Sequence, residues 1–122
     1  MLTDKQEERL ERSSRIGKTV WHKKKGGGAY QAMGIVVDEV YVIVGEYKHL
    51  IQRIEFADGA AWGGNKYAYR TGYYTYDANK RHVKWGQYTQ FLTESEYREL
   101  LLKARQRGWD VFSADDRGAG TA

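Results

Sequence analysis

The most regular pattern of hydrophobic and polar positions lies between residues 93 and 107. Apolar side chains recur there at the i, i+3, i+4, i+7 spacing of one helical face, at Tyr97, Leu100, Leu101 and Ala104. The four residues from Thr93 to Glu96 have the spacing of a capping box, which satisfies free backbone donors at a helix start. Gly108 follows the last turn, where a left-handed residue commonly ends a helix, and Trp109 is placed to fold back on that turn. The pattern predicts a helix over 93–107 with one buried face.

Between residues 30 and 92 the pattern changes to the alternation and the Val, Ile and Tyr enrichment of β-strands. Strands are expected at 30–37, 40–47, 50–56, 66–76 and 83–92, with Asp38 and Glu39 forming the first turn. The connections are too short for parallel crossovers, so neighbouring strands should pair antiparallel. We therefore expect an α+β fold in which an antiparallel sheet of four to five strands packs against one C-terminal helix.

The first 28 residues follow a more polar pattern. Thr3 and Gln6 have capping-box spacing, which predicts a helix over 4–15. Leu10 and Ile16 are the apolar side chains that this stretch offers, so the helix is expected to be weakly attached. Three glycines at 26–28 indicate a flexible joint. The expected organisation is a basic arm at 1–28, one α+β domain at 29–112 and a disordered, small and polar tail at 113–122.

Charge makes this N-terminal segment the most distinctive part of the chain. The 122 residues carry a net charge of +4. Residues 1–28 hold eight basic and four acidic side chains, whereas the remaining residues are balanced, and no acid occurs from Arg12 to Lys25. A basic segment of this kind favours polyanionic partners.

Several classes of protein are disfavoured by the residues that are missing. There is no cysteine, which excludes disulfides and thiolate metal sites and fits a reducing compartment. The three histidines lie in separate segments without metal-ligand spacing, and no nucleophile motif is present, so no cofactor, metal or catalytic activity is expected. No apolar run approaches the ~18 residues of a membrane span, and the N-terminus does not resemble a secretory signal. These features predict a cytoplasmic protein with no membrane partner.

Tyrosines and cations alternate along the expected fourth and fifth strands. Five tyrosines and one arginine fall within ten residues, at Tyr67, Tyr69, Arg70, Tyr73, Tyr74 and Tyr76. Strand alternation places the side chains of positions 67, 69 and 73 on one face and those of 70, 74 and 76 on the other. Aromatic rings that stack on bases, beside cations that neutralise phosphates, are typical of single-stranded nucleic-acid binding. The same residue types also form protein–protein hot spots.

The candidate nucleic-acid-binding residues are a lysine run, the tyrosine-rich strand and the following basic turn: Lys23, Lys24, Lys25, Arg70, Tyr73, Tyr74, Lys80, Arg81, Lys84 and Trp85. Tyr73, Tyr74 and Trp85 are expected to stack on bases and the cations to contact phosphates. The leading hypothesis is a non-catalytic nucleic-acid-binding module with a preference for single-stranded DNA or RNA. The alternative is a small protein-binding adaptor or inhibitor, for example a phage or mobile-element protein that blocks a bacterial defence nuclease.

Residues 66–105 resemble the transcriptional coactivator PC4 family. The resemblance rests on the stretch Tyr69 to Tyr74, a charged turn, and a Leu-Thr pair at 92–93 that leads into a helix with Tyr97 and Leu100. It implies a four-stranded antiparallel sheet plus helix, a homodimer formed through the helix, and single-stranded DNA lying on the sheet. Carried over by position, Arg70, Tyr73, Tyr74 and Lys84 would be contact residues. The family's Pro-Gly-Lys-Lys-Gly segment is replaced here by Val-Lys-Trp-Gly at 83–86.

Overall fold

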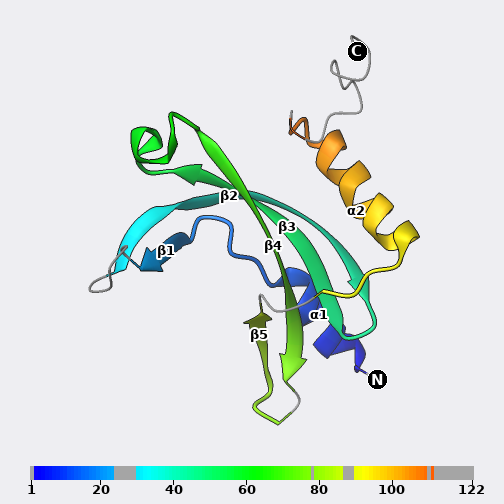
Figure 1. Cartoon of the computed structure of the whole chain (residues 1–122). Helices are drawn as coiled ribbons and strands as arrows, with labels where there is room; N and C mark the ends of the chain where they lie inside the picture. The colour runs from blue at the N-terminus through cyan, green and yellow to red at the C-terminus, as the bar shows by residue number, and fades with distance from the viewer. Residues whose placement is uncertain (1, 24–29, 78, 87–89, 110, 112–122) are drawn as a thin grey trace.

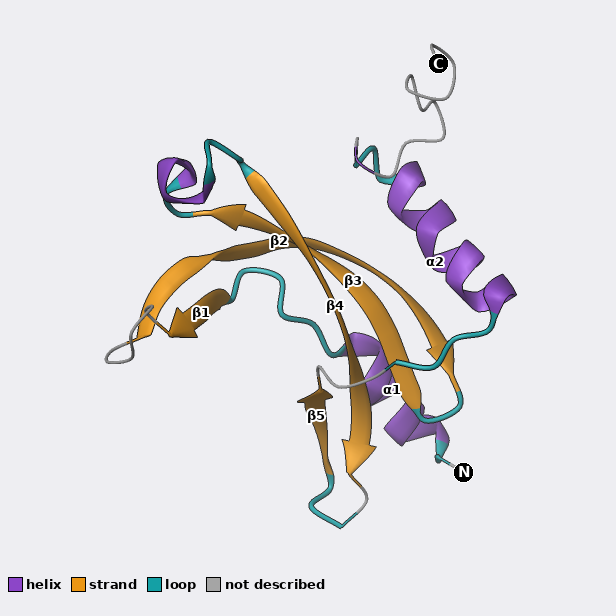
Figure 2. Ribbon diagram, in the orientation of Figure 1, coloured by secondary structure: helices purple, strands orange, loops and turns teal. Residues whose placement is uncertain are grey.

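A computed structural model describes residues 2–23, 30–77, 79–86, 90–109 and 111 (Figure 1). The elements follow the order α1 (Asp4–Arg12), β1 (Thr19–Lys23), β2 (Tyr30–Val44), β3 (Tyr47–Phe56), the 3₁₀ turn η1 (Gly59–Trp62), β4 (Tyr67–Asp77), β5 (His82–Gly86) and α2 (Glu94–Gln106). The five strands form one antiparallel sheet in chain order. Figure 2 shows that this sheet is strongly curled, with the two helices on opposite sides of it. The α+β prediction is confirmed.

The outer face of the sheet is covered by α2. Leu100 and Ala104 pack against Val40, Val42 and Ile51 in one buried cluster that also contains Trp109. The capping box at Thr93 forms as expected. The helix ends with Gly108 at φ +78°, whose N–H donates to the Arg105 carbonyl oxygen, while the Trp109 N–H donates to that of Ala104. These two bonds make the Schellman ending that a glycine at this position favours.

The expected turn at Asp38 and Glu39 is wrong, because β2 runs without a break through both residues. Asp38 pairs with Arg53 and Glu39 with Gln52, after a register shift that leaves Val37 as the extra residue of a β-bulge. Adjacent residues of a strand point to opposite faces, so the two acids reach opposite sides of the sheet. Both acids accept hydrogen bonds from other segments of the chain, so the strand continues where a solvent-exposed turn was expected.

On the α2 side, Asp38 holds the C-terminal end of the helix by hydrogen bonds. Its carboxylate accepts hydrogen bonds from the Trp109 Nε1 at 3.2 Å and from the Arg107 guanidinium at 3.1 Å. On the inner side, the Glu39 carboxylate is 5% exposed and accepts from the Ser14 hydroxyl, the Arg15 N–H and the Gln52 amide. Two successive residues of β2 therefore hold segments from opposite ends of the chain.

The weak attachment expected for the N-terminal helix is also wrong. Leu10 is fully buried in a cluster with Leu50 and Tyr74 on the inner face. The Lys48 ammonium donates to the carbonyl oxygens of Glu11 and Ser13, both at 2.6 Å, where the end of α1 leaves acceptors free. One apolar side chain and several buried polar groups thus fasten a helix whose surface is otherwise polar.

The N-terminal segment belongs to the fold, since β1 pairs with β2 along 19–23. The strand predicted at 83–92 is shorter, because β5 ends at Gly86. Leu92 packs against the α2 cluster, and that contact takes it away from the sheet edge. The expected tail at 113–122 lies outside the described residues. Within the part of the chain that the structure describes, no helix has both the length and the apolar surface to cross a membrane.

We predict that Glu39→Gln lowers the free energy of unfolding by about 2 kcal/mol, because it replaces an accepting oxygen with a donor beside other buried donors. Glu55→Gln, at an exposed position of β3, is the matched control and should change stability by less than about 0.5 kcal/mol. Urea denaturation measures both effects. Equal stability of the two variants would show that the buried carboxylate does not hold the N-terminal segment.

Candidate nucleic-acid interface

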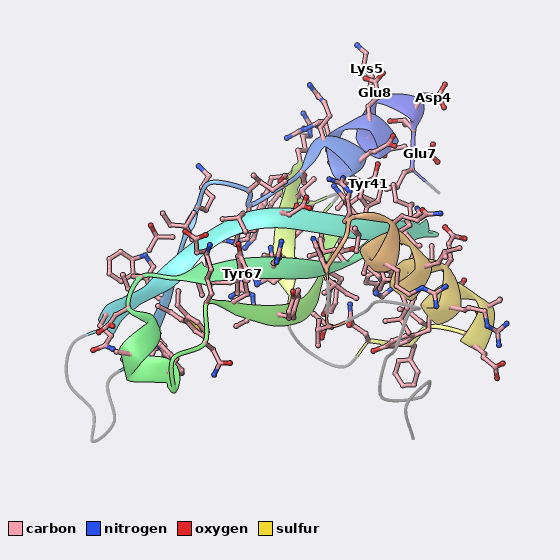
Figure 3. All side chains as sticks on the ribbon, turned by 90° about the horizontal axis from the view of Figure 1, so that it is seen from above. Asp4, Lys5, Glu7, Glu8, Tyr41 and Tyr67 are labelled. Carbon is pink, nitrogen blue, oxygen red and sulfur yellow. The ribbon has the colours of Figure 1, made fainter. Side chains whose placement is uncertain are left out.

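The charges of α1 are sorted onto two flanks by the helical repeat. Residues three or four positions apart share a flank, so Lys5, Arg9 and Arg12 lie on one side. The acids Asp4, Glu7 and Glu11 lie on the other side, and Figure 3 shows Asp4 and Glu7 projecting away from Lys5. Glu8 lies between the two flanks, next to Lys5. The Tyr41 hydroxyl donates to the Glu11 carboxylate at 3.1 Å, which turns the acidic flank toward β2. The basic flank consequently faces β5.

Arg9 and Arg12 meet β5 across an open groove. The groove has a volume of about 330 Å³ and is lined by Arg9, Arg12 and Ser13 on one side and by His82 and Val83 on the other. We call it the basic groove. The Arg9 guanidinium lies 5.6 Å from the centroid of the Tyr76 ring, a cation–π contact that holds it against the sheet. Segments that lie about seventy residues apart in the sequence thus build a single cationic surface.

Two further arginines lie on the same inner face. Arg70 donates from Nε to the Gln52 amide oxygen at 2.8 Å, and its guanidinium lies 5.0 Å from the Trp85 ring centroid. Burial lowers the pKa of Arg70, and the nearby charge of Arg15 lowers it further. Trp85 follows Val83 by two residues on β5, so it shares the face that lines the basic groove. The inner face therefore presents four arginines beside one tryptophan.

The rings expected to form one stacking platform are divided between the two faces. Tyr74 pairs with Trp85 across β4 and β5 on the inner face, whereas Tyr73 points outward. Tyr74 is 6% exposed beneath α1, so the prediction that it stacks on bases is wrong. Trp85 is half-buried. Only Tyr73 and Trp85 of the three retain accessible ring surface, and they do so on opposite sides of the sheet.

Two glycines set the positions of these rings. A Cβ atom on Gly72 would lie 2.3 Å from Cη2 of Trp85, so the indole occupies the space that any side chain there would need. A Cβ atom on Gly86 would lie 2.6 Å from the Tyr73 ring in the same way. Each ring therefore lies across a glycine of the neighbouring strand, an arrangement that fixes both aromatics against the backbone.

The predicted cations have different surroundings. Lys80 and Arg81 are exposed in the turn before His82, where Asp77 accepts from the N–H groups of Asn79 and Lys80. Lys84 points to the outer face and lies 3.9 Å from the Asp77 carboxylate. Lys24 and Lys25 lie outside the described residues, and Lys23 is the last residue of β1. Lys80 and Arg81 directly precede His82, which lines the basic groove, whereas Lys84 points to the other face.

Arg9, Arg12 and Arg15 are the inner-face residues that sequence reasoning missed. The sequence predicts a weakly attached basic arm for these residues, because α1 has so few apolar positions. Their spacing of three residues and the absence of acids after Arg12 were the available signal. What the sequence does not show is that residues 13–15 cross beneath the sheet.

The outer face carries a second concave site, with aromatic walls. Tyr47, His49, Tyr73 and Phe91 line a pocket of about 220 Å³, and Phe91 is 85% exposed. The Tyr47 and His49 rings are stacked with centroids 5.8 Å apart. The Gln90 amide donates to the Gly72 carbonyl oxygen beside His49. This aromatic pocket has no cation among its lining residues, which separates it chemically from the basic groove.

Among the described residues, no group of three or more His, Cys, Asp or Glu side chains is arranged to hold a metal ion. No family model matches the sequence, and no curated protein or solved structure is similar to it. The resemblance to the coactivator family stays a prediction. The function is therefore inferred from the chemistry of the site.

Acid should destabilise the protein through His49. Burial lowers the pKa of this imidazole below its ordinary value of 6.5, so the unfolded chain takes up the proton first as the pH falls. Stability should decrease from pH 6.5 down to the lowered pKa and then level off. Urea denaturation between pH 7.5 and 5.5 measures this, and His49→Gln should flatten the profile. The exposed His82→Gln is the control and should keep the wild-type profile; a flattened control would contradict the assignment to His49.

Proposed function

We propose that this protein is a non-catalytic nucleic-acid-binding module that takes a single strand of DNA or RNA along the inner face of its sheet. The observation that carries the proposal is the convergence of Arg9 and Arg12 with His82 in the basic groove. The two arginines attract the phosphate backbone without regard to sequence. The adjacent exposed turn adds Lys80 and Arg81.

Trp85 supplies the aromatic surface for a base. It lies on the groove's face of β5, and stacking of one base on an aromatic ring contributes about 1–3 kcal/mol. A strand whose phosphates follow Arg9 and Arg12 would bring its bases toward this ring. A paired duplex hides its bases from such contact, and this supports a preference for single strands.

Binding should be strongest at low salt and should weaken between about 50 and 200 mM salt, because each neutralised phosphate adds roughly −0.7 to the log–log slope for single strands. The double variant Arg9→Gln/Arg12→Gln should weaken binding at least about tenfold and reduce the slope by roughly 1.4. Fluorescence anisotropy with labelled single-stranded DNA, duplex DNA and RNA measures both.

The matched control is Arg98→Gln/Arg105→Gln, which removes the same charge from the exposed surface of α2. It should bind as the wild type does. Equal losses of affinity in the two double variants would show that net charge alone explains the effect. Binding that is absent at low salt, or indifferent to salt, would reject the proposal.

A second candidate function, binding to a protein, is supported by the outer surface of α2. Tyr97, Leu101 and Leu102 line an open groove of about 360 Å³ that is flanked by Glu94, Arg98 and Arg105. Tyr97 is 43% and Leu102 is 41% exposed. An apolar centre with a charged rim is typical of protein interfaces, including those of homodimers. If no nucleic acid binds, this surface is the one to probe with Leu102→Asp.

A further inference from the structure

Three hydrogen-bond donors on the inner face are buried without a partner among the described residues. They are the Arg15 Nε, the Arg70 Nη2 and the Tyr74 hydroxyl. More than nine in ten buried polar groups in folded proteins have a hydrogen-bond partner, so three orphaned donors in one region need an explanation. Hydrogen bonds connect Arg70 to Gln52, Gln52 to Glu39 and Glu39 to the Arg15 backbone. Arg70 and Tyr74 both contact the Trp85 ring, so the three groups belong to one region beneath β4.

The surrounding charges leave this region positive. Glu39 is the buried carboxylate beside the two guanidinium groups, and its oxygens already accept from Ser14, the Arg15 backbone and Gln52. Lys48 also lies within the influence of Glu39 and, more weakly, of Glu11. Arg15, Arg70 and Lys48 against Glu39 and Glu11 leave an excess of one positive charge in a half-buried region. Buried charge is costly unless it is paired, and an anion would supply that pairing.

Tyr74 contributes a donor and no negative charge. Burial raises the pKa of its hydroxyl above the ordinary value of 10.0, so the proton stays on the oxygen at neutral pH. The Arg70 side chain is fixed by its bond to Gln52 and its contact with Trp85, and this leaves Nη2 as its free donor. Two guanidinium donors and one hydroxyl suit a tetrahedral oxyanion, because phosphate oxygens accept charge-assisted hydrogen bonds from several directions.

We propose that Arg15, Arg70 and Tyr74 form a binding site for one phosphate group on the inner face of the sheet. The site is separate from Arg9 and Arg12, so it stands whether or not the basic groove binds a nucleic-acid strand. Its phosphate comes either from the end of a strand lying in that groove or from a free phosphate compound. The ligand chemistry is the same in both cases.

The first test measures thermal unfolding of the full chain against inorganic phosphate, with chloride at matched ionic strength as reference. The wild type should show a saturable rise in Tm, since a ligand that binds only the folded state stabilises it by mass action. A rise that is linear and never saturates is the general effect of an excluded salt and would overturn the proposal. No rise above chloride would overturn it as well.

Tyr74→Phe tests the site without opening a cavity. Removing an orphaned buried hydroxyl should leave the phosphate-free protein at least as stable as the wild type. The same change should weaken phosphate binding by roughly tenfold, the loss of one hydrogen bond to a charged group. Tyr76→Phe makes the identical change two residues away on the same face and should keep the wild-type response. A Tyr74→Phe response equal to that of the wild type would overturn the site.

Arg70→Gln should abolish the phosphate-dependent rise, whereas Arg9→Gln/Arg12→Gln should keep it. This contrast distinguishes failure of the phosphate site from failure of the proposed nucleic-acid groove. Oligonucleotides with a 5′-phosphate and a 5′-hydroxyl then identify the source. Tighter binding of the phosphorylated strand, lost in Arg70→Gln, assigns the site to a strand end; equal binding of the two strands, with inorganic phosphate still binding, assigns it to a free phosphate compound.

Discussion

The carboxylate of Glu39 is the constraint on which the arrangement of the inner face depends. A buried carboxylate requires donors, and here it receives them from Ser14, Arg15 and Gln52. The hydrogen bonds to this carboxylate hold the segment that follows α1 beneath the curled sheet. This position in turn brings Leu10 into the core and leaves Arg15 facing Arg70. The cationic character of the inner face is thus a result of how one negative group is accommodated.

The hydrogen bonds from Lys48 to the end of α1 fix the direction of that helix. The ammonium occupies the C-terminal end, where cations are favoured by the helix dipole as well as by free carbonyl oxygens. Burial lowers the pKa of Lys48, and the charges of Glu39 and Glu11 oppose that shift. Because Lys48 holds the C-terminal end of α1 and Leu10 is buried on its inner side, the basic flank has a single orientation relative to β5. A helix with one buried apolar residue could not achieve this by hydrophobic packing alone.

Sequence patterns predict the structure correctly where the local rules of spacing and capping agree with burial. The capping boxes of both helices, the glycine ending of α2 and the antiparallel sheet follow from spacing and turn length. The patterns failed where polar residues are buried. Asp38 and Glu39 have the composition of a turn, and α1 has that of a solvated helix, because neither hydropathy nor period reveals a distant hydrogen-bond partner. The candidate site was therefore found only in part: its turn cations and Trp85 were expected, whereas Arg9, Arg12 and Arg15 were not.

The position of Asp38 and Glu39 on successive residues of β2 has a consequence for the order of folding. The bond from Ser14 to Glu39 spans 25 residues, whereas the bond from Trp109 to Asp38 spans 71. During synthesis the chain emerges N-terminal end first, so the partners of Glu39 leave the ribosome well before Trp109 exists. The contacts of Glu39 can form on the nascent chain, while the outer face stays exposed until α2 is complete. Val40, Val42 and Ile51 are then the apolar surface that stays open to solvent until Leu100 and Ala104 cover it.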